Sequence, residues 1–150
     1  MPYRVEKFKM EHFRNFDSRE EQEAEVKFLY DHKAFQDAWI GILPVFTLFY
    51  NEKPIMIYGM QNSLMGTYYP MAYAGKGIDK HRFAVIRCLY DYVDKFVDYD
   101  VRRFEAYVSV TDKKAQRLAE FFGMEVIGYR RQASASGEDQ VIYERLWRKS

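Results

Sequence analysis

The sequence predicts a single α+β domain that runs from residue 1 to residue 150. A chain of 150 residues can bury one hydrophobic core and leaves little room for a second. Short β-branched and aromatic runs recur along the chain, and residues 83–97 have the apolar spacing of an amphipathic helix. A third pattern, at 108–126, is a buried strand that turns directly into a short helix ending at Gly123.

In the first half of the chain, alternating or β-branched apolar runs predict four strands. They cover residues 3–8, 44–49, 55–60 and 64–74. Asn51 supplies the turn of a hairpin between the second and third strands, while Gly66 and Pro70 interrupt the fourth with a bulge or an edge position. Residues 9–39 are charged and helical in character, with an N-cap candidate at 17–18.

The second half of the chain predicts a helix, a strand, a helix and two strands. The long amphipathic helix has Phe83, Ile86 and Val93 on its expected apolar face. The following elements are expected at residues 103–110, 113–122, 124–129 and 140–147. A small, polar stretch at 132–139 is typical of a loop.

Composition argues against several classes of function. The 23 Lys and Arg nearly balance the 22 Asp and Glu, so no global field draws the chain onto nucleic acid, and any anion site must be local. No apolar run approaches the roughly 18 residues of a membrane span, and the N-terminus is charged where a signal peptide is apolar, which predicts a cytoplasmic protein without a membrane partner. The single Cys88 and the scattered His12, His32 and His81 have no metal-ligand spacing.

The order of elements, with a motif at 112–124, resembles the GNAT superfamily of N-acetyltransferases over essentially the whole chain. In that family the motif reads Asn-x-x-Ala, then a Tyr seven residues after the Asn, then Gly-Phe. Ala115 and Gly123 match this motif, while Asp112 stands for the Asn, Met124 for the Phe and Ala119 for the Tyr. The resemblance implies a mixed, mostly antiparallel sheet of six to seven strands that splays between its fourth and fifth strands. About four helices would flank this sheet, with acetyl-CoA in the gap.

The family's pyrophosphate loop lies between the fourth strand and the central helix, where this chain has residues 72–77. Both glycines of the loop are kept and its leading Gln or Arg is lost. Glycines let the backbone approach phosphates, and amides at a helix N-terminus point at an anion. The resemblance implies that the cofactor contacts Gly75, Lys76, Gly77, Lys80 and His81 at its pyrophosphate, Met71 and Tyr73 along the pantetheine arm, and Asp112 near the far end. The simpler interpretation is a turn followed by a helix that Asp79 caps.

The catalytic residues stay unassigned. Acyl transfer to an amine needs a base for the amine and an acid for the leaving thiolate. The acid Tyr of the family is replaced by Ala119, and the expected fourth strand has no carboxylate. Tyr68, Tyr69, Tyr107 or Glu105 can substitute only if the sheet turns them toward the substrate, which strand alternation alone does not decide.

Two functions therefore stay open. The first is transfer of an acetyl group from acetyl-CoA to an amine on a small molecule or a protein. The second is a catalytically inactive protein of the same fold that binds another protein, and homo-oligomers are open in both cases.

A looser resemblance to acetyltransferase-like proteins of short-tailed bacteriophages favours the second function, in phage assembly, in the virion or in host interference, within the host cytoplasm. It rests on residues 74–76, the basic cluster at 80–82 and the degenerate motif at Asp112. Nucleic-acid binding through Arg102–Arg103, Arg130–Arg131 and 145–149 is a third alternative, which the near-neutral charge disfavours.

Overall fold

The computed structural model describes residues 2–32, 43–64, 66–97 and 101–147. The strands are β1 (Tyr3–Lys7), β2 (Val45–Tyr50), β3 (Lys53–Leu64), β4 (Thr67–Ala74), β5 (Arg103–Ser109), β6 (Glu125–Arg130) and β7 (Gln140–Leu146). The α-helices are α1 (Glu23–Asp31), α3 (Arg82–Phe96) and α4 (Lys113–Phe121), and the 3-10 helices are η1 (Met10–Asn15), η2 (Glu20–Gln22) and η3 (Ile78–His81).

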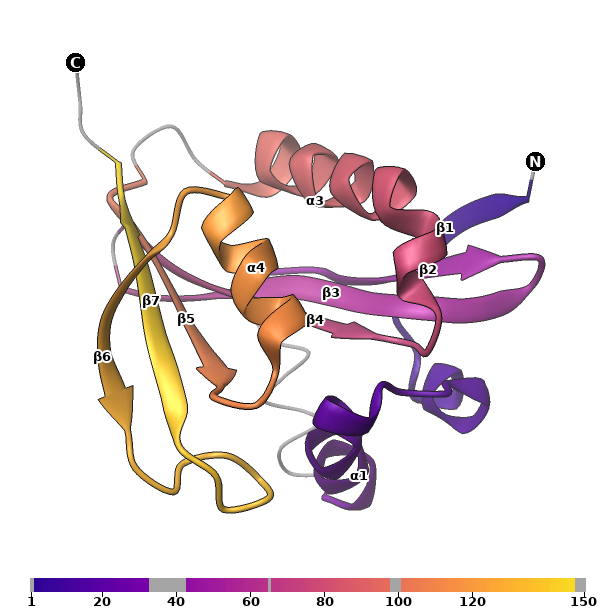
Figure 1. Ribbon diagram of the computed structural model, residues 1–150. Coiled ribbons are helices and arrows are strands. Elements are labelled where there is room, and N and C mark those ends of the chain that lie inside the picture. The colour runs from indigo at the N-terminus through magenta and orange to yellow at the C-terminus, as the bar shows by residue number, and fades with distance from the viewer. Residues whose placement is uncertain (1, 33–42, 65, 98–100, 148–150) are drawn as a thin grey trace. The chain divides into compact units, whose positions relative to one another are not determined.

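The strands form one seven-stranded sheet in the order β1-β2-β3-β4-β5-β7-β6 (Figure 1). The sheet is mostly antiparallel, with a parallel ladder between β4 and β5 that joins Thr67 to Arg103 and Tyr68 to Phe104. The predicted α+β class and the mixed sheet are confirmed. The chain divides into two compact units: Met1–Gln61 with Met71–Val97 forms the first unit, and Asn62–Pro70 with Asp98–Ser150 forms the second.

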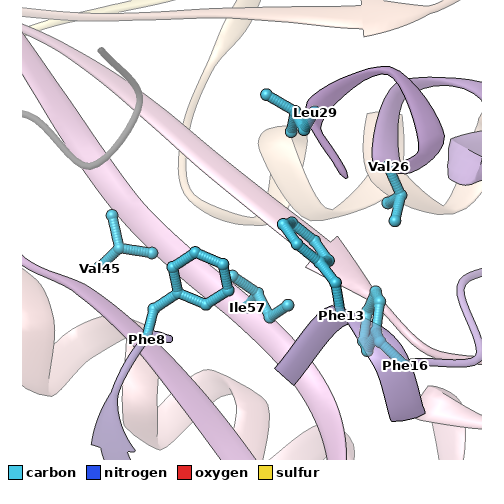
Figure 2. Packing of buried hydrophobic residues seen from close by; sticks show 7 residues of the cluster. All are labelled: Phe8, Phe13, Phe16, Val26, Leu29, Val45 and Ile57. Carbon is cyan, nitrogen blue, oxygen red and sulfur yellow. The ribbon is translucent and has the colours of Figure 1, made fainter. Parts of the chain in front are cut away.

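The core of the first unit follows from the alternation of β2 and β3. Val45 and Ile57 belong to a buried cluster on one face, shown in Figure 2. Its other members come from η1, α1 and the residues that directly follow β1 and η1, and are Phe8, Phe13, Phe16, Val26 and Leu29. Phe46 and Tyr58 each follow one of these two residues, so alternation places them on the opposite face of the sheet. There they contact the ring of Tyr92 on α3. Figure 1 accordingly shows α3 on one face of these strands and α1 on the other.

The buried face of α3 differs from the predicted one. Val85 and Tyr92 are buried, whereas Phe83 is 75% exposed. The hydroxyl of Tyr92 donates to the Pro44 carbonyl at 2.6 Å and accepts the Met60 amide hydrogen at 3.1 Å. This hydroxyl therefore fixes the position of α3 on the sheet.

In the second unit, α4 ends as the glycine predicts. Gly123 has φ +77°, its amide donates to Glu120, and the amide of Met124 donates to Ala119, which is the Schellman pattern. The strand before α4 is less buried than expected, because only Phe104 of β5 is buried. The side chains of Glu120 and Tyr143 hydrogen-bond at 3.4 Å, so β7 turns Tyr143 toward α4.

Several predicted boundaries were wrong. Leu64 belongs to β3, and Gly66, at φ +82°, lies in the turn before β4 instead of interrupting a strand. The described part of the predicted helical region at 9–39 forms η1, η2 and α1, and residues 33–39 lie outside the described residues. The turn at Asn51 is confirmed, with positive φ at both Asn51 and Glu52.

We expect Tyr92→Phe to lower the free energy of unfolding by about 1–3 kcal/mol, because it leaves a buried amide and carbonyl without their partner. Urea unfolding measures this effect. Tyr90→Phe on the same helix, where the ring is half exposed, is the control and is expected to change stability by about 0.5 kcal/mol or less. Equal losses in the two variants would contradict the anchoring role of Tyr92.

Candidate functional site

The end of β4 is held by backbone on both edges. On one edge, the amide of Gly75 donates to the Ile55 carbonyl of β3 at 2.8 Å. On the other edge, the amide of Lys76 donates to the Asp17 carbonyl at 2.8 Å, and the amide of Arg19 donates to Ala74 at 3.0 Å. Residues 17–22, here called the 17–22 segment, therefore run beside the last residues of β4.

The side chain of Gln22 extends this contact along the strand. Its Nε2 donates to the Ala72 carbonyl at 2.9 Å, and its Oε1 accepts the amide hydrogen of Ala74 at 2.8 Å. Because the backbone groups of successive residues point to opposite edges of a strand, Ala72 and Ala74 share one edge. Met71 and Tyr73 share the direction of Gly75, toward β3, so their backbone groups are not directed at the edge expected to meet a pantetheine arm.

The two positions of the predicted loop are occupied by glycine for different structural reasons. A Cβ on Gly75 would lie 3.2 Å from the Asp17 oxygen and 3.3 Å from the Ile55 oxygen, so only glycine lets the three backbones approach. Gly77 has φ +78°, and a Cβ there would meet nothing within 4 Å. The backbone at Gly77 is therefore open to a ligand, while the amides of Gly75 and Lys76 already have acceptors.

The basic side chains near this loop differ in whether they are exposed or hydrogen-bonded to the sheet. The Lys76 ammonium lies 3.5 Å from the Asp17 carboxylate and is well exposed. Lys80 is exposed within η3. His81 is bound to the sheet instead, since its Nδ1 lies 2.7 Å from the Tyr3 hydroxyl and its ring lies 4.5 Å from that of Tyr50. Lys76 and Lys80 are thus the lysines that can meet an anion here.

Asp79, the predicted cap residue, is not in the N-cap position of α3. Asp79 lies inside η3, and the N-cap residue of α3 is His81, whose side chain makes no capping hydrogen bond. Glycine at position 77 and the short η3 separate the end of β4 from α3.

Tyr73 and Met71 pack against the buried cluster of the first unit. Burial and a hydrogen bond to the Glu25 carboxylate raise the pKa of Tyr73 far above its ordinary value. The Tyr73 side chain is therefore a neutral phenol across the physiological pH range.

Asp112 caps α4. Its Oδ1 accepts the amide hydrogen of Ala115 at 3.1 Å, and the residue is 3% exposed. A buried N-cap carboxylate is typical of a structural role at the start of a helix. Ala119, in the place of the family's Tyr, is also buried.

The tyrosines and carboxylate considered as catalytic alternatives separate into two groups. Tyr68 is buried beside Phe104, so it belongs to the core. Tyr69 stacks on Tyr107, with ring centroids 6.4 Å apart, and the Glu105 carboxylate is a neighbour of the Tyr107 hydroxyl. Burial, together with the neighbouring Glu105 carboxylate, raises the pKa of Tyr107.

The charged partners of Glu105 were not predicted from the sequence. Arg103 donates from Nε to Glu144 at 2.6 Å and from Nη2 to Glu105 at 3.0 Å. The guanidinium of Arg130 lies 4.4 Å from the centre of the Tyr107 ring. The i, i+2 spacing of Arg103 and Glu105 in a strand could have indicated their contact, but Glu144 and Arg130 come from strands far along the chain.

His12 is the centre of a second polar cluster that the sequence did not reveal. Its Nε2 lies 2.8 Å from Glu6 and its Nδ1 lies 2.7 Å from the Thr47 hydroxyl. This is the carboxylate, imidazole and hydroxyl order of a nucleophilic triad. Thr47 is 0% exposed, however, so its hydroxyl cannot reach a substrate and the cluster is structural.

Comparison with known proteins gives a consistent result for the fold. No family model matches the sequence, and no curated protein matches it. Ard1 from Thermoplasma volcanium superposes with a TM-score of 0.70 at 6% identity, covering 99% of this chain and 100% of that one. The RimL ribosomal-protein acetyltransferase, solved with coenzyme A, has a TM-score of 0.61 at 12% identity, covering 97% and 94%. A GNAT-family acetyltransferase from Bacillus anthracis has a TM-score of 0.63 at 12% identity, covering 97% and 95%.

The fold is that of the GNAT acetyltransferases.

Within this GNAT fold, the structure brings some predicted site residues together and separates others. Gly75, Lys76, Gly77 and Lys80 lie at the junction of β4 and η3, as the resemblance implies. No group of three or more His, Cys, Asp or Glu among the described residues is arranged to hold a metal ion. None of the helices in the described ranges is long and apolar enough to cross a membrane.

We expect Gly75→Ala to lower the free energy of unfolding by about 1–3 kcal/mol, since the new methyl group is pressed against two backbone oxygens that cannot move aside cheaply. Gly77→Asn is the matched change, because Asn adopts left-handed backbone readily and the position is open; its cost should be below about 1 kcal/mol. Chemical denaturation compares the two. A larger loss for Gly77→Asn would contradict the close approach at Gly75.

Proposed function

We propose that the chain binds acetyl-CoA or another acyl-CoA and transfers its acyl group to an amine. The observation that carries the proposal is the junction of β4 with η3, where the open backbone of Gly77 lies between the exposed lysines 76 and 80. Exposed glycine backbone next to a helix start and cationic side chains favours a diphosphate. The solved structures with a similar fold, which include an acetyltransferase in complex with coenzyme A, support the same class of ligand.

Only some of the residues expected to contact the cofactor are free to do so. Gly77 and the ammonium groups of Lys76 and Lys80 would hold the diphosphate. The amides of Gly75 and Lys76 would stay with the protein, since each already donates to a carbonyl. The pantetheine arm would meet the backbone of Ala72 and Ala74 at the end of β4. When bound, the cofactor supplies an activated thioester.

A second function has its own supporting observation. The 17–22 segment occupies the very backbone groups of Ala72 and Ala74 that an extended pantetheine arm would need. A covered edge favours a catalytically silent protein of this fold that binds another protein, as in phage assembly or host interference. The replacement of the acid Tyr by Ala119 points the same way.

Thermal unfolding with and without acetyl-CoA tests the first function. Ligand at about one hundred times its dissociation constant should stabilise the protein by about 2.7 kcal/mol.

We expect Lys80→Ala to weaken binding by about tenfold, since a charge-assisted contact to phosphate is lost. Lys95→Ala, in the last turn of α3, removes the same charge far from the loop and should leave the affinity unchanged. Equal effects of the two lysine changes, or no stabilisation at millimolar acetyl-CoA, would contradict the site.

Gln22→Ala separates the two functions. Removing this side chain frees the Ala72 carbonyl and the Ala74 amide, so acetyl-CoA should bind more tightly if the arm uses that edge. Calorimetric titration of the variant and the wild type measures the change. If neither protein binds acetyl-CoA, the result would favour the second function, a catalytically silent protein. If both bind acetyl-CoA equally, the pantetheine arm does not use this edge of β4.

A further inference from the structure

The strand β6 lies at one edge of the sheet, and its side chains are left in solvent. It ends the strand order, and in the part of the chain that the structure describes it pairs with β7 alone (Figure 1). Every residue of β6 except Gly128 is exposed, whereas β7 is largely buried. The outer edge of such a strand presents backbone N–H and C=O groups that another strand can pair with.

The exposed side chains of β6 are apolar in the middle of the strand and charged at its ends. Val126, Ile127 and Tyr129 are 48%, 49% and 66% exposed. Glu125 begins the strand and Arg130 ends it. β-branched and aromatic residues favour strand pairing, and β6 has neither the Lys nor the Pro that commonly protects an edge. Its composition is therefore that of a strand paired on both sides.

A β-bulge decides which side chains of β6 share a face. The register with β7 shifts by one residue at Ile127. Glu125 lies opposite Glu144, and Arg130 lies opposite Gln140, four positions away on β7. Residues four apart on a strand point to the same face, so Glu125 and Arg130 share a face as well. In a strand without the bulge, residues five apart would point to opposite faces.

Val126 and Tyr129 share the other face for the same reason. Their partners on β7 are Tyr143 and Val141, which are two positions apart. Tyr143 hydrogen-bonds to Glu120 of α4, so this is the face on which α4 packs. The bulge thus sorts β6 into a charged pair on one face and an apolar pair on the other.

We propose that β6 is the interface of a homodimer, in which it pairs antiparallel with β6 of a second copy about a two-fold axis. An axis between Ile127 and Gly128 places all six residues of each strand opposite a residue of the other. Position 125 then meets 130, and position 126 meets 129. Residues opposite each other in an antiparallel pair point to the same face, and the bulge satisfies this condition for both pairs. The inference does not depend on the proposed acyl transfer.

Charge complementarity favours a second copy over another kind of partner. In this register Glu125 of each copy meets Arg130 of the other, so opposite charges face each other at both ends of the interface. Arg130 would exchange its contact with the Tyr107 ring for this carboxylate. On the face of α4, Val126 meets Tyr129, and a β-branched residue opposite an aromatic one is a favourable pair. A surface that is complementary to itself fits the interface of a two-fold dimer.

Charge reversal at the two ends of β6 tests the interface and its register. Sedimentation equilibrium measures the dissociation constant of the dimer for the wild type, Glu125→Arg, Arg130→Glu and the double variant. Each single reversal sets like charges against each other at both ends and should raise the constant by about tenfold. The double variant again pairs Arg with Glu and should dimerise like the wild type.

An equimolar mixture of the two single variants should form a heterodimer, because Arg again meets Glu at each end. Since a misfolded chain could not assemble in this way, the mixture also shows that both variants fold. Glu11→Arg and Arg14→Glu, at exposed positions of η1, are the matched controls and should leave the dissociation constant unchanged. A monomeric wild type, equal losses in the η1 controls, or a double variant that stays monomeric would overturn the proposal.

Disulfide formation tests the register in a second way. Val126→Cys and Tyr129→Cys, each in a Cys88→Ser background, should form a disulfide-linked heterodimer when they are mixed and oxidised. Opposite Cα atoms of an antiparallel pair lie about 4.5–5.5 Å apart, within the range of a disulfide. Either variant alone should cross-link much more slowly, because its two cysteines lie three positions apart along the paired strands. Equal rates in the mixture and in the single variants would contradict the register.

Discussion

Three stretches of backbone meet at Gly75, and the arrangement of the first unit depends on that meeting. The strand β3 contacts Gly75 on one side and the 17–22 segment contacts it on the other, at distances that leave no room for a side chain. This close approach fixes where β4 ends. It thereby fixes where η3 and α3 begin, and with them the positions of Lys76, Gly77 and Lys80.

The same constraint divides the loop between the fold and a ligand. The amides of Gly75 and Lys76 satisfy carbonyls of the protein itself, as buried backbone groups must. Gly77 follows immediately, with left-handed backbone and open space around it. A Gly-x-Gly sequence thus contains one glycine that packing requires and one that a diphosphate can approach, which a motif alone does not distinguish.

The sequence predicted the elements whose signal is local. The alternation of β1, the turn at Asn51 and the end of α4 at Gly123 depend on neighbouring residues, and each is confirmed. The prediction that Phe83 lies on the buried face of α3 was wrong, because aromatic residues lie on more than one side of that helix. The contact of Gln22 with β4 could not be predicted, since it joins residues about fifty positions apart through backbone atoms that every residue has. For the same reason Glu105 was found as a candidate, but its partners Glu144 and Arg130 were not.

Amide hydrogen exchange measured by NMR, with and without acetyl-CoA, tests this division of the loop most directly. The Gly75 amide should exchange slowly in the free protein and change little on addition of the cofactor, because it belongs to the sheet. The Gly77 amide should exchange quickly when free, and its resonance should shift as acetyl-CoA binds. Rapid exchange at Gly75 in the free protein, or a cofactor-induced shift at Gly75 that exceeds the one at Gly77, would contradict the account.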